Sequence, residues 1–215
     1  MRITKIVQQK RKKERFSIFI DGRYSFSLSE ENLIKHKLKT GQEINETQIE
    51  DINREDEKKK AINSVFHLLS IRSRSEKELG EKLKTKKISE ENITDAIGRI
   101  KELGYINDEK FAKERISYLR QKGKGPFIIK MDLRRAGIQE DTINELLFKD
   151  KTSKNIEIEQ VKNIVLSRLK RMGKIDAKTK FNRLMGFLAR RGFDIETIKE
   201  GLKEAKLDIE KDDSV

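Results

Sequence analysis

The chain has 215 residues, which is enough for one domain and a small additional module; 40% of them are charged, 34% are hydrophobic, and the net charge is +13. A basic excess of this size favours a polyanionic partner or a strongly acidic protein surface. The absence of cysteine excludes disulfides and thiolate zinc sites. Because no stretch approaches the ~20 apolar residues of a membrane span, the expected compartment is cytoplasmic.

Residues 1–44 are predicted to form a small β module. Hydrophobic and polar residues alternate on both sides of Asp21 and Gly22. This pair favours a two-residue hairpin turn, because both turn positions take positive φ. Residues 3–8 are a candidate third strand. Ser29, followed by two glutamates, predicts the start of a short helix that ends before Gly41.

From about residue 45 the hydrophobic pattern becomes helical, and it then recurs in three copies. Eight apolar positions align at an offset of 50 residues, except that five extra residues between Leu169 and Leu184 lengthen the second offset to 55. The aligned sets are Ala61, Phe66, Leu69, Leu79, Leu83, Ile88, Ile93 and Ile97; Phe111, Ile116, Leu119, Ile129, Leu133, Ile138, Ile143 and Leu147; and Val161, Leu166, Leu169, Leu184, Leu188, Phe193, Ile198 and Leu202.

A period near 50 residues with three helices per copy predicts a tandem helical array. Each copy is too thin to bury its own apolar face, so neighbouring copies must stack. The predicted fold is therefore mainly α: an elongated array of three three-helix repeats behind the β-hairpin module. The predicted boundaries are 45–107, 108–150 and 151–207 for the repeats, with an acidic, frayed tail at 208–215.

The joints between helices carry recognisable end signals. Ser75 and Glu78 have the spacing of a capping box. Gly104 is placed to stop a helix in the left-handed conformation, and Asn107 with the acids after it is expected to cap the next helix. Tyr105 is expected to bury its ring at the junction between repeats.

Basic residues concentrate between the aligned apolar positions. Residues 168–191 contain nine Lys or Arg and one acid, and residues 113–135 contain eight and two. The predicted contacts with a partner or with nucleic acid are Arg72, Arg74, Lys122, Lys124, Arg134, Arg135, Arg168, Lys170, Arg171, Arg183, Arg190 and Arg191. Several of these lie at the ends or starts of second helices, where stacked repeats would align them as one discontinuous strip. The cluster at residues 10–15 is the next candidate.

Two of these segments have a structural interpretation beside the functional one. Arg72 and Arg74 bracket a helix start, where they can hold a phosphate or carboxylate. Alternatively, Arg72 caps the preceding helix and Arg74 is solvated. Residues 122–126 (KGKGP) are interpreted first as a tight linker and second as an anion contact at a helix N-terminus.

No catalytic constellation is found in the sequence. His67 falls within an apolar stripe and is predicted to pack there, whereas His36 is predicted to be solvated at a helix end. The acids fall in cap and i,i+4 positions. Residues 122–126 lack the spacing of a P-loop. The chain is therefore predicted not to be an enzyme and to need no metal or cofactor.

Three segments resemble the RecX family in order and spacing. They are RSRSE at residues 72–76, followed by Glu78, Leu79 and Leu83; LGYINDE at 103–109, followed by Phe111 and Ala112; and KGKGP at 122–126, followed by Ile129, Leu133, Gly137 and Ile138. The resemblance covers residues 58–205, and the N-terminal hairpin is similar to an extension of some members. Lys87 stands where a glycine helix stop is common in the family, and the third repeat diverges.

The resemblance implies a monomeric, non-enzymatic regulator in homologous recombination, DNA repair and the SOS response. The family is one of tandem three-helix repeats, and the resemblance implies binding along the helical groove of RecA filaments and inhibition of RecA. The basic residues would meet acidic RecA surface, exposed DNA phosphates, or both. The alternative is an architectural protein that binds DNA directly without RecA; the sparse aromatic residues, mostly at apolar-stripe positions, argue against it.

Overall fold

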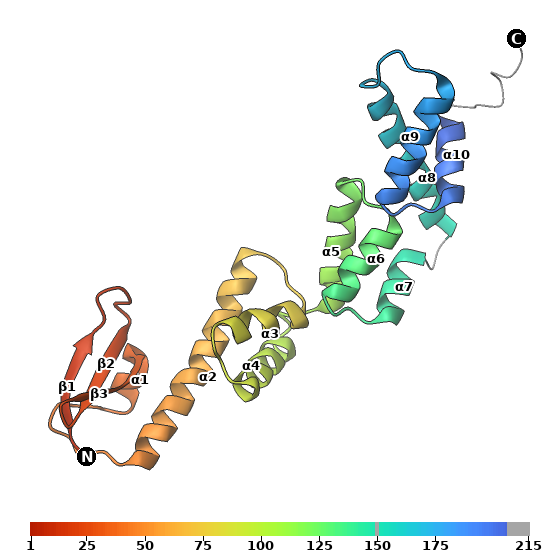
Figure 1. The fold of residues 1–215 in the computed structure, drawn as a ribbon. Helices are drawn as coiled ribbons and strands as arrows, with labels where there is room; N and C mark the ends of the chain where they lie inside the picture. The colour runs from red at the N-terminus through yellow and green to blue at the C-terminus, as the bar shows by residue number, and fades with distance from the viewer. Residues whose placement is uncertain (149–150, 206–215) are drawn as a thin grey trace, which may run out of the picture. The chain divides into compact units, whose positions relative to one another are not determined.

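The computed structural model describes residues 1–148 and 151–205. Within them three strands precede the helices (Figure 1): β1 (Ile3–Gln8), β2 (Arg15–Ile20), β3 (Arg23–Ser29), α1 (Glu30–Lys35), α2 (Glu46–Ile71), α3 (Glu76–Thr85), α4 (Glu90–Glu102), α5 (Asp108–Gln121), α6 (Pro126–Arg135), α7 (Glu140–Phe148), α8 (Lys151–Leu169), α9 (Ala177–Arg190) and α10 (Ile195–Glu204). The mainly α prediction is confirmed. The predicted acidic tail at 208–215 lies outside the described residues. No helix in the described ranges is long and apolar enough to cross a membrane.

The N-terminal module is an antiparallel sheet in the order β1-β2-β3. Asp21 and Gly22 form the predicted turn between β2 and β3, with φ of 48° and 81°. Ser29 caps α1, because its side chain accepts a hydrogen bond from the Asn32 amide. The module has its own hydrophobic core, formed by Ile3, Ile18, Ile20, Phe26, Leu28, Leu38, Ile44 and Ile52.

A buried carboxylate joins α2 to this sheet. Asp56, which is 6% exposed, accepts hydrogen bonds from Arg15 Nη2 at 2.8 Å, the Ser29 amide at 2.8 Å and Asn32 Nδ2 at 3.2 Å. A buried charge is tolerated when it is paired and hydrogen-bonded in this way. The sequence pattern had placed the acids in caps and surface pairs, so this network was not foreseen.

The prediction that His36 is solvated is wrong. His36 is the C-cap of α1, and its Nε2 lies 2.9 Å from Glu55 Oε2, with both side chains only partly exposed. The hydrogen bond from Lys35 lowers the pKa of Glu55, and the hydrogen bond with His36 lowers it further. Glu55 lies on α2, so a partner distant in the sequence decides the environment of this histidine.

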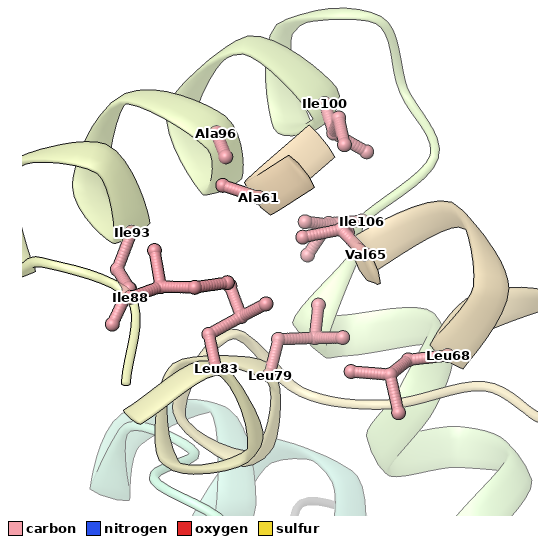
Figure 2. Packing of buried hydrophobic residues seen from close by; sticks show 10 residues of the cluster. All are labelled: Ala61, Val65, Leu68, Leu79, Leu83, Ile88, Ile93, Ala96, Ile100 and Ile106. Carbon is pink, nitrogen blue, oxygen red and sulfur yellow. The ribbon is translucent and has the colours of Figure 1, made fainter. Parts of the chain in front are cut away.

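The first three-helix segment consists of α2, α3 and α4. Figure 2 shows the side chains that meet between these helices. The cluster comprises Ala61, Val65, Leu68, Leu79, Leu83, Ile88, Ile93, Ala96, Ile100 and Ile106. Val65 occupies the core and its neighbour Phe66 is 37% exposed, contrary to the prediction. His67, predicted to pack, is also exposed. The buried spacing is i, i+4, i+7, the usual spacing of one helix face.

The prediction for Tyr105 is also wrong. It was expected to bury its ring, but it is 62% exposed and packs edge-to-face on Phe66, with 5.2 Å between ring centroids. Gly104 just before it does take the left-handed conformation, with φ 78°, and Asn107 caps α5 as predicted. The backbone signals at this joint were therefore reliable, whereas the side-chain packing was not.

The second and third segments repeat the architecture. Helices α5, α6 and α7 enclose Phe111, Ala112, Ile116, Leu119, Ile129, Leu133, Ala136, Ile138, Ile143 and Leu147. Helices α8, α9 and α10 enclose Val161, Val165, Leu184, Leu188, Phe193, Ile198 and Leu202. The predicted alignment holds in the second and third helices of each copy except at Ile97 in α4, which is only partly buried while Ala96 and Ile100 are buried.

The first helix of the middle copy is shifted by one residue from the predicted alignment. Ala61, Val65 and Leu68 in α2 correspond by burial to Ala112, Ile116 and Leu119 in α5. This offset is one residue longer than predicted. As a consequence Leu166, the expected counterpart of Ile116 in the third copy, is 40% exposed, while Val165 is buried.

The described part of the chain divides into two compact units. One contains residues 1–74 and 79–106, and the other contains residues 75–78 and the chain from Asn107 onward. In the second unit Ser75 Oγ accepts from the Glu78 amide at 3.2 Å, as the capping box predicts, and it donates to the Ala136 carbonyl at 2.6 Å.

Candidate anion-binding surfaces

The predicted basic residues fall into several different environments. Arg134, at the end of α6, donates two hydrogen bonds to Glu140, at 2.7 and 2.8 Å. The bond from Arg134, together with one from Lys130, lowers the pKa of Glu140 to about 2. Arg134 is therefore already paired, in the bidentate geometry that arginine and carboxylate favour.

Arg135 and Arg190 are exposed at the ends of α6 and α9. Within the described residues neither forms an ion pair. Lys170 and Arg183 are likewise exposed. A cation in the last turn stabilises the helix through the helix dipole, but its side chain stays open to a partner. Arg135 and Arg190 are therefore accessible to a binding partner, whereas the guanidinium group of Arg134 already binds Glu140.

Arg72 and Arg74 bond to the backbone around the end of α2. Arg74 Nε donates to the Leu68 carbonyl at 3.3 Å, and Arg72 Nη1 donates to the Ser73 carbonyl at 2.8 Å. The helix-capping role thus belongs to Arg74, which occupies one of the unpaired carbonyls of the last turn. This geometry favours the structural interpretation of Arg74 over an anion clamp.

The glycine-containing loop at residues 122–126 is a packed joint. The Gly125 amide donates to the Arg191 carbonyl at 2.8 Å, and the Phe127 amide donates to the Gly192 carbonyl at 3.1 Å. A Cβ on Gly125 would lie 2.5 Å from the Gly192 backbone. The start of α6 therefore has amides that are already bonded, and the linker interpretation of the loop fits better than the anion contact.

The two lysines of this loop are placed differently. Lys122 is exposed, with its Nζ 5.6 Å from the ring centroid of Tyr118. Lys124 is half-buried, and its carbonyl accepts from Gln160 Nε2 at 3.4 Å. Lys122 is thus the more accessible of the two to a polyanion.

An arginine cluster in the second unit has a defined geometry. The Arg168 guanidinium carbon lies 3.8 Å from the ring centroid of Phe187, and that of Arg191 lies 4.6 Å from it. Arg191 Nη1 also donates to the carbonyls of Lys122 and Gly123, each at 3.0 Å. The ring thus positions both guanidinium groups through cation–π contact, and the two carbonyls further fix that of Arg191.

A cavity of about 660 Å³ opens beside this cluster. Arg120, Arg168, Arg171 and Arg191 line it together with Phe187. Three of these arginines were predicted as contacts; Arg120 and Phe187 were not, because a lone arginine and a lone aromatic within helical patterns give no signal of their own. The structure thus brings together residues from α5, α8 and α9.

A second basic cleft, of about 920 Å³, lies in the first unit between the β1–β2 turn and α2. Its basic residues are Lys10, Arg11, Lys12, Lys13, Arg15, Lys59, Lys60 and Lys86, and His67 lines it as well. Two of its acids are engaged, Asp56 with Arg15 and Glu31 with Lys59. The fallback cluster at residues 10–15 therefore belongs to a larger surface than the sequence indicated.

The described residues contain no group of three or more His, Asp or Glu that could hold a metal ion. The chemistry of both surfaces is that of cations positioned for an anionic partner.

Three family models match successive parts of the chain. The "Regulatory protein RecX N-terminal domain" matches residues 1–45, "RecX, first three-helix domain" matches 61–99, and "RecX, second three-helix domain" matches 107–147. These matches fall on the sheet module, on the first three-helix segment and on the second.

Whole-chain relatives agree with the models. "Regulatory protein RecX" of Bacillus subtilis is 36% identical over 98% of this chain and 79% of the relative, and that of Listeria monocytogenes serotype 4a is 30% identical over 98% and 78%. A crystal structure of regulatory protein RecX covers 96% of this chain and 99% of its own, at 27% identity and a TM-score of 0.62. RecX from Lactobacillus salivarius covers 71% of this chain and 99% of its own, at 25% identity and a TM-score of 0.63. The chain belongs to the RecX family of regulatory proteins.

Proposed function

We propose that this protein regulates RecA by binding the RecA–DNA filament as a monomer, and that it inhibits RecA without catalysing a reaction. Membership of a family of regulatory proteins supports a regulatory role. The observation that carries the proposal is the recurrence of exposed arginines at equivalent helix ends, Arg135 as the last residue of α6 and Arg190 as the last residue of α9, neither of which forms an ion pair within the described residues.

A repeated surface suits a repeated partner. We propose that the successive three-helix segments, at residues 45–107, 108–150 and 151–207, present their basic residues to successive protomers or phosphates of the filament. Contacts that are weak singly then add through effective concentration. Direct DNA binding is expected to be weak and to be screened by salt.

The test reverses charge at the two unpaired helix ends. We expect Arg135→Glu combined with Arg190→Glu to weaken inhibition of RecA-catalysed strand exchange at least tenfold in the concentration required, because repulsion replaces attraction at both contacts. Both residues are exposed, so the fold is expected to be retained.

The matched control is Lys199→Glu combined with Lys203→Glu, on exposed positions of α10 that are not predicted contacts. It changes the net charge by the same amount and is expected to inhibit nearly as well as the wild type. Equal inhibition by the wild type and the arginine variant would reject these helix ends as the contact surface. Equal loss in both variants would mean that net charge alone matters.

A further inference from the structure

The cavity beside Phe187 is a candidate ligand site in its own right. Its lining residues lie in α5, α8 and α9 or directly after the end of one of these helices. All of them belong to the second compact unit. Its volume of about 660 Å³ lies within the roughly 300–1,000 Å³ typical of small-molecule sites. It is therefore larger than a single inorganic anion needs.

The cavity carries a concentrated positive charge. Four of its lining residues are arginines, and Glu159 is its one acidic lining residue among the described ones. Glu159 is already engaged, because its carboxylate bonds to Lys162 at 3.1 Å and to Asn163 at 3.2 Å. Within the described residues no carboxylate forms an ion pair with any of the four arginines. An anion is therefore the partner that this charge lacks.

The arginines are held before any ligand arrives. Phe187 contacts the guanidinium groups of both Arg168 and Arg191, and two backbone carbonyls fix Arg191. Gly123, beside Arg191 Nη1, takes the left-handed conformation with φ 67°, which favours glycine at this point of the loop. Like charges held close together raise the free energy of the folded protein unless an anion offsets them. Because the guanidinium groups are already in place, binding of an anion costs less conformational entropy.

A third observation comes from Arg120. Its Nη2 atom is buried and has no hydrogen-bond partner among the described residues. Buried donors are normally satisfied, but an atom without accessible surface does not face the cavity, so Arg120 contributes positive charge to the lining and not a donor presented to a ligand. Arginine is also the side chain whose planar donors best match the oxygens of a phosphate.

The rest of the cavity lining combines apolar side chains with uncharged polar ones. Ile156 and Ile164 supply hydrophobic surface, and Asn163 and Ser167 supply polar groups. A ligand that fits this wall has a phosphorylated end and a flat or partly apolar body. We propose that the cavity binds a nucleotide, with its phosphate groups against the arginines and its base against the isoleucines.

Two sources could supply this ligand: a free nucleoside triphosphate, or a nucleotide unit of single-stranded DNA. Neither involves RecA, so binding is measured on this protein alone and its outcome is independent of the filament proposal.

The first experiment measures the Kd of a fluorescent ATP analogue and of a fluorescein-labelled oligo(dT) by anisotropy. We expect Arg168→Ala combined with Arg171→Ala to weaken binding of the recognised probe at least tenfold. Phe187→Leu, which retains apolar volume but removes the aromatic face, is expected to weaken it severalfold. Lys178→Ala is the charge-matched control, since Lys178 is an exposed residue of α9 that neither lines the cavity nor is a predicted contact, and it is expected to change the Kd less than twofold.

The competition arms identify the source and test the class. If ATP displaces labelled oligo(dT) from the wild-type protein but not from the cavity variants, the cavity accepts both free nucleotide and single-stranded DNA. If ATP binds and oligo(dT) does not, the cavity accepts only the free nucleotide. The proposal is overturned if neither probe is weakened by the cavity variants. It is also overturned if tripolyphosphate or a hexaglutamate peptide displaces the probe as well as ATP does, because the site would then recognise charge alone.

Discussion

At the scale of single residues, Glu157 combines burial with an ionisable group. It lies in α8 and is only 6% exposed. Burial raises the pKa of its carboxyl group to about 7; Asp194 raises it too, whereas Arg120 and Lys154 lower it. The folded state thus holds a proton that the unfolded chain releases near pH 4.5. Stability is therefore lost as the pH rises between about 4.5 and 7.

Glu157→Gln should be more stable than the wild type above pH 7, because the amide imitates the protonated carboxyl. The expected gain at pH 8 is about 1–3 kcal/mol, and it should shrink toward zero at pH 5. Urea unfolding of both proteins at the two pH values measures the difference. A difference that stays the same at both pH values would contradict the assignment.

Lys87 ends its helix in a backbone conformation that suits glycine. Its φ is 59°, and the equivalent residues of the other two segments are Gly137 and Gly192, with φ of 86° and 90°. Left-handed backbone costs an L-residue roughly 1–2 kcal/mol, partly offset by the greater freedom of glycine in the unfolded chain. We expect Lys87→Gly to raise the free energy of unfolding by about 0.5–1 kcal/mol. Thermal unfolding measures this, with Lys86→Gly as the control that should bring no gain.

At the scale of elements, each three-helix segment has a core of its own, so the expectation that a single copy is too thin to bury its apolar face is wrong. In each, the second helix contributes two fully buried side chains: Leu79 and Leu83, Ile129 and Leu133, and Leu184 and Leu188. The spacing of these pairs places both on one face of a short helix. The helices depend on these contacts, since isolated helices of ten residues are marginal in water.

Leu133→Ala is expected to cost about 2–5 kcal/mol of unfolding free energy, because the side chain is fully buried and leaves a cavity. Leu166→Ala, at a residue that is 40% exposed, should cost less than about 1 kcal/mol. Chemical denaturation of both variants compares them. Similar losses in the two would mean that the core is not organised as described.

The hydrophobic period predicted the helices, and the turn and cap residues predicted the hairpin turn at Asp21 and Gly22 and the left-handed stop at Gly104, because each is a local property of the chain. It did not predict which of two adjacent residues enters the core: Val65 rather than Phe66 is buried. That choice depends on how a helix is rotated against its neighbours. For the candidate site, Arg168, Arg171 and Arg191 were predicted, but their meeting with Arg120 and Phe187 depends on tertiary packing. The Glu140 partner of Arg134 depends on where α7 begins.

At the scale of the whole molecule, 50 basic residues against 37 acidic ones give a net charge of +13. Much of this charge is paired locally, as with Arg134 and Arg115, which bonds to Asp132 at 2.7 and 3.0 Å. The two basic cavities gather further cations, although Arg15 and Lys59 in the second are also paired with carboxylates. Electrostatic attraction to a polyanion is therefore expected without a sequence-reading contact.

Binding to a labelled single strand of DNA should be weak and should fall steeply with salt, because each neutralised phosphate releases a counterion. The slope of log K against log [salt] is about −0.7 per phosphate contacted on a single strand. Titrations at several salt concentrations between about 50 and 200 mM, a range over which the affinity of such complexes falls strongly, measure this slope. Affinity that is independent of salt would contradict the electrostatic account.

The central claim is that the protein acts on a RecA filament and does not simply cover DNA. The most direct test is DNA-dependent ATP hydrolysis by RecA, measured while this protein is added at levels too low to coat the DNA. We predict strong inhibition at such levels, because a repeated surface can act from a few positions along the filament. Inhibition that appears only when the protein saturates the DNA would contradict the claim and favour an architectural DNA-binding role.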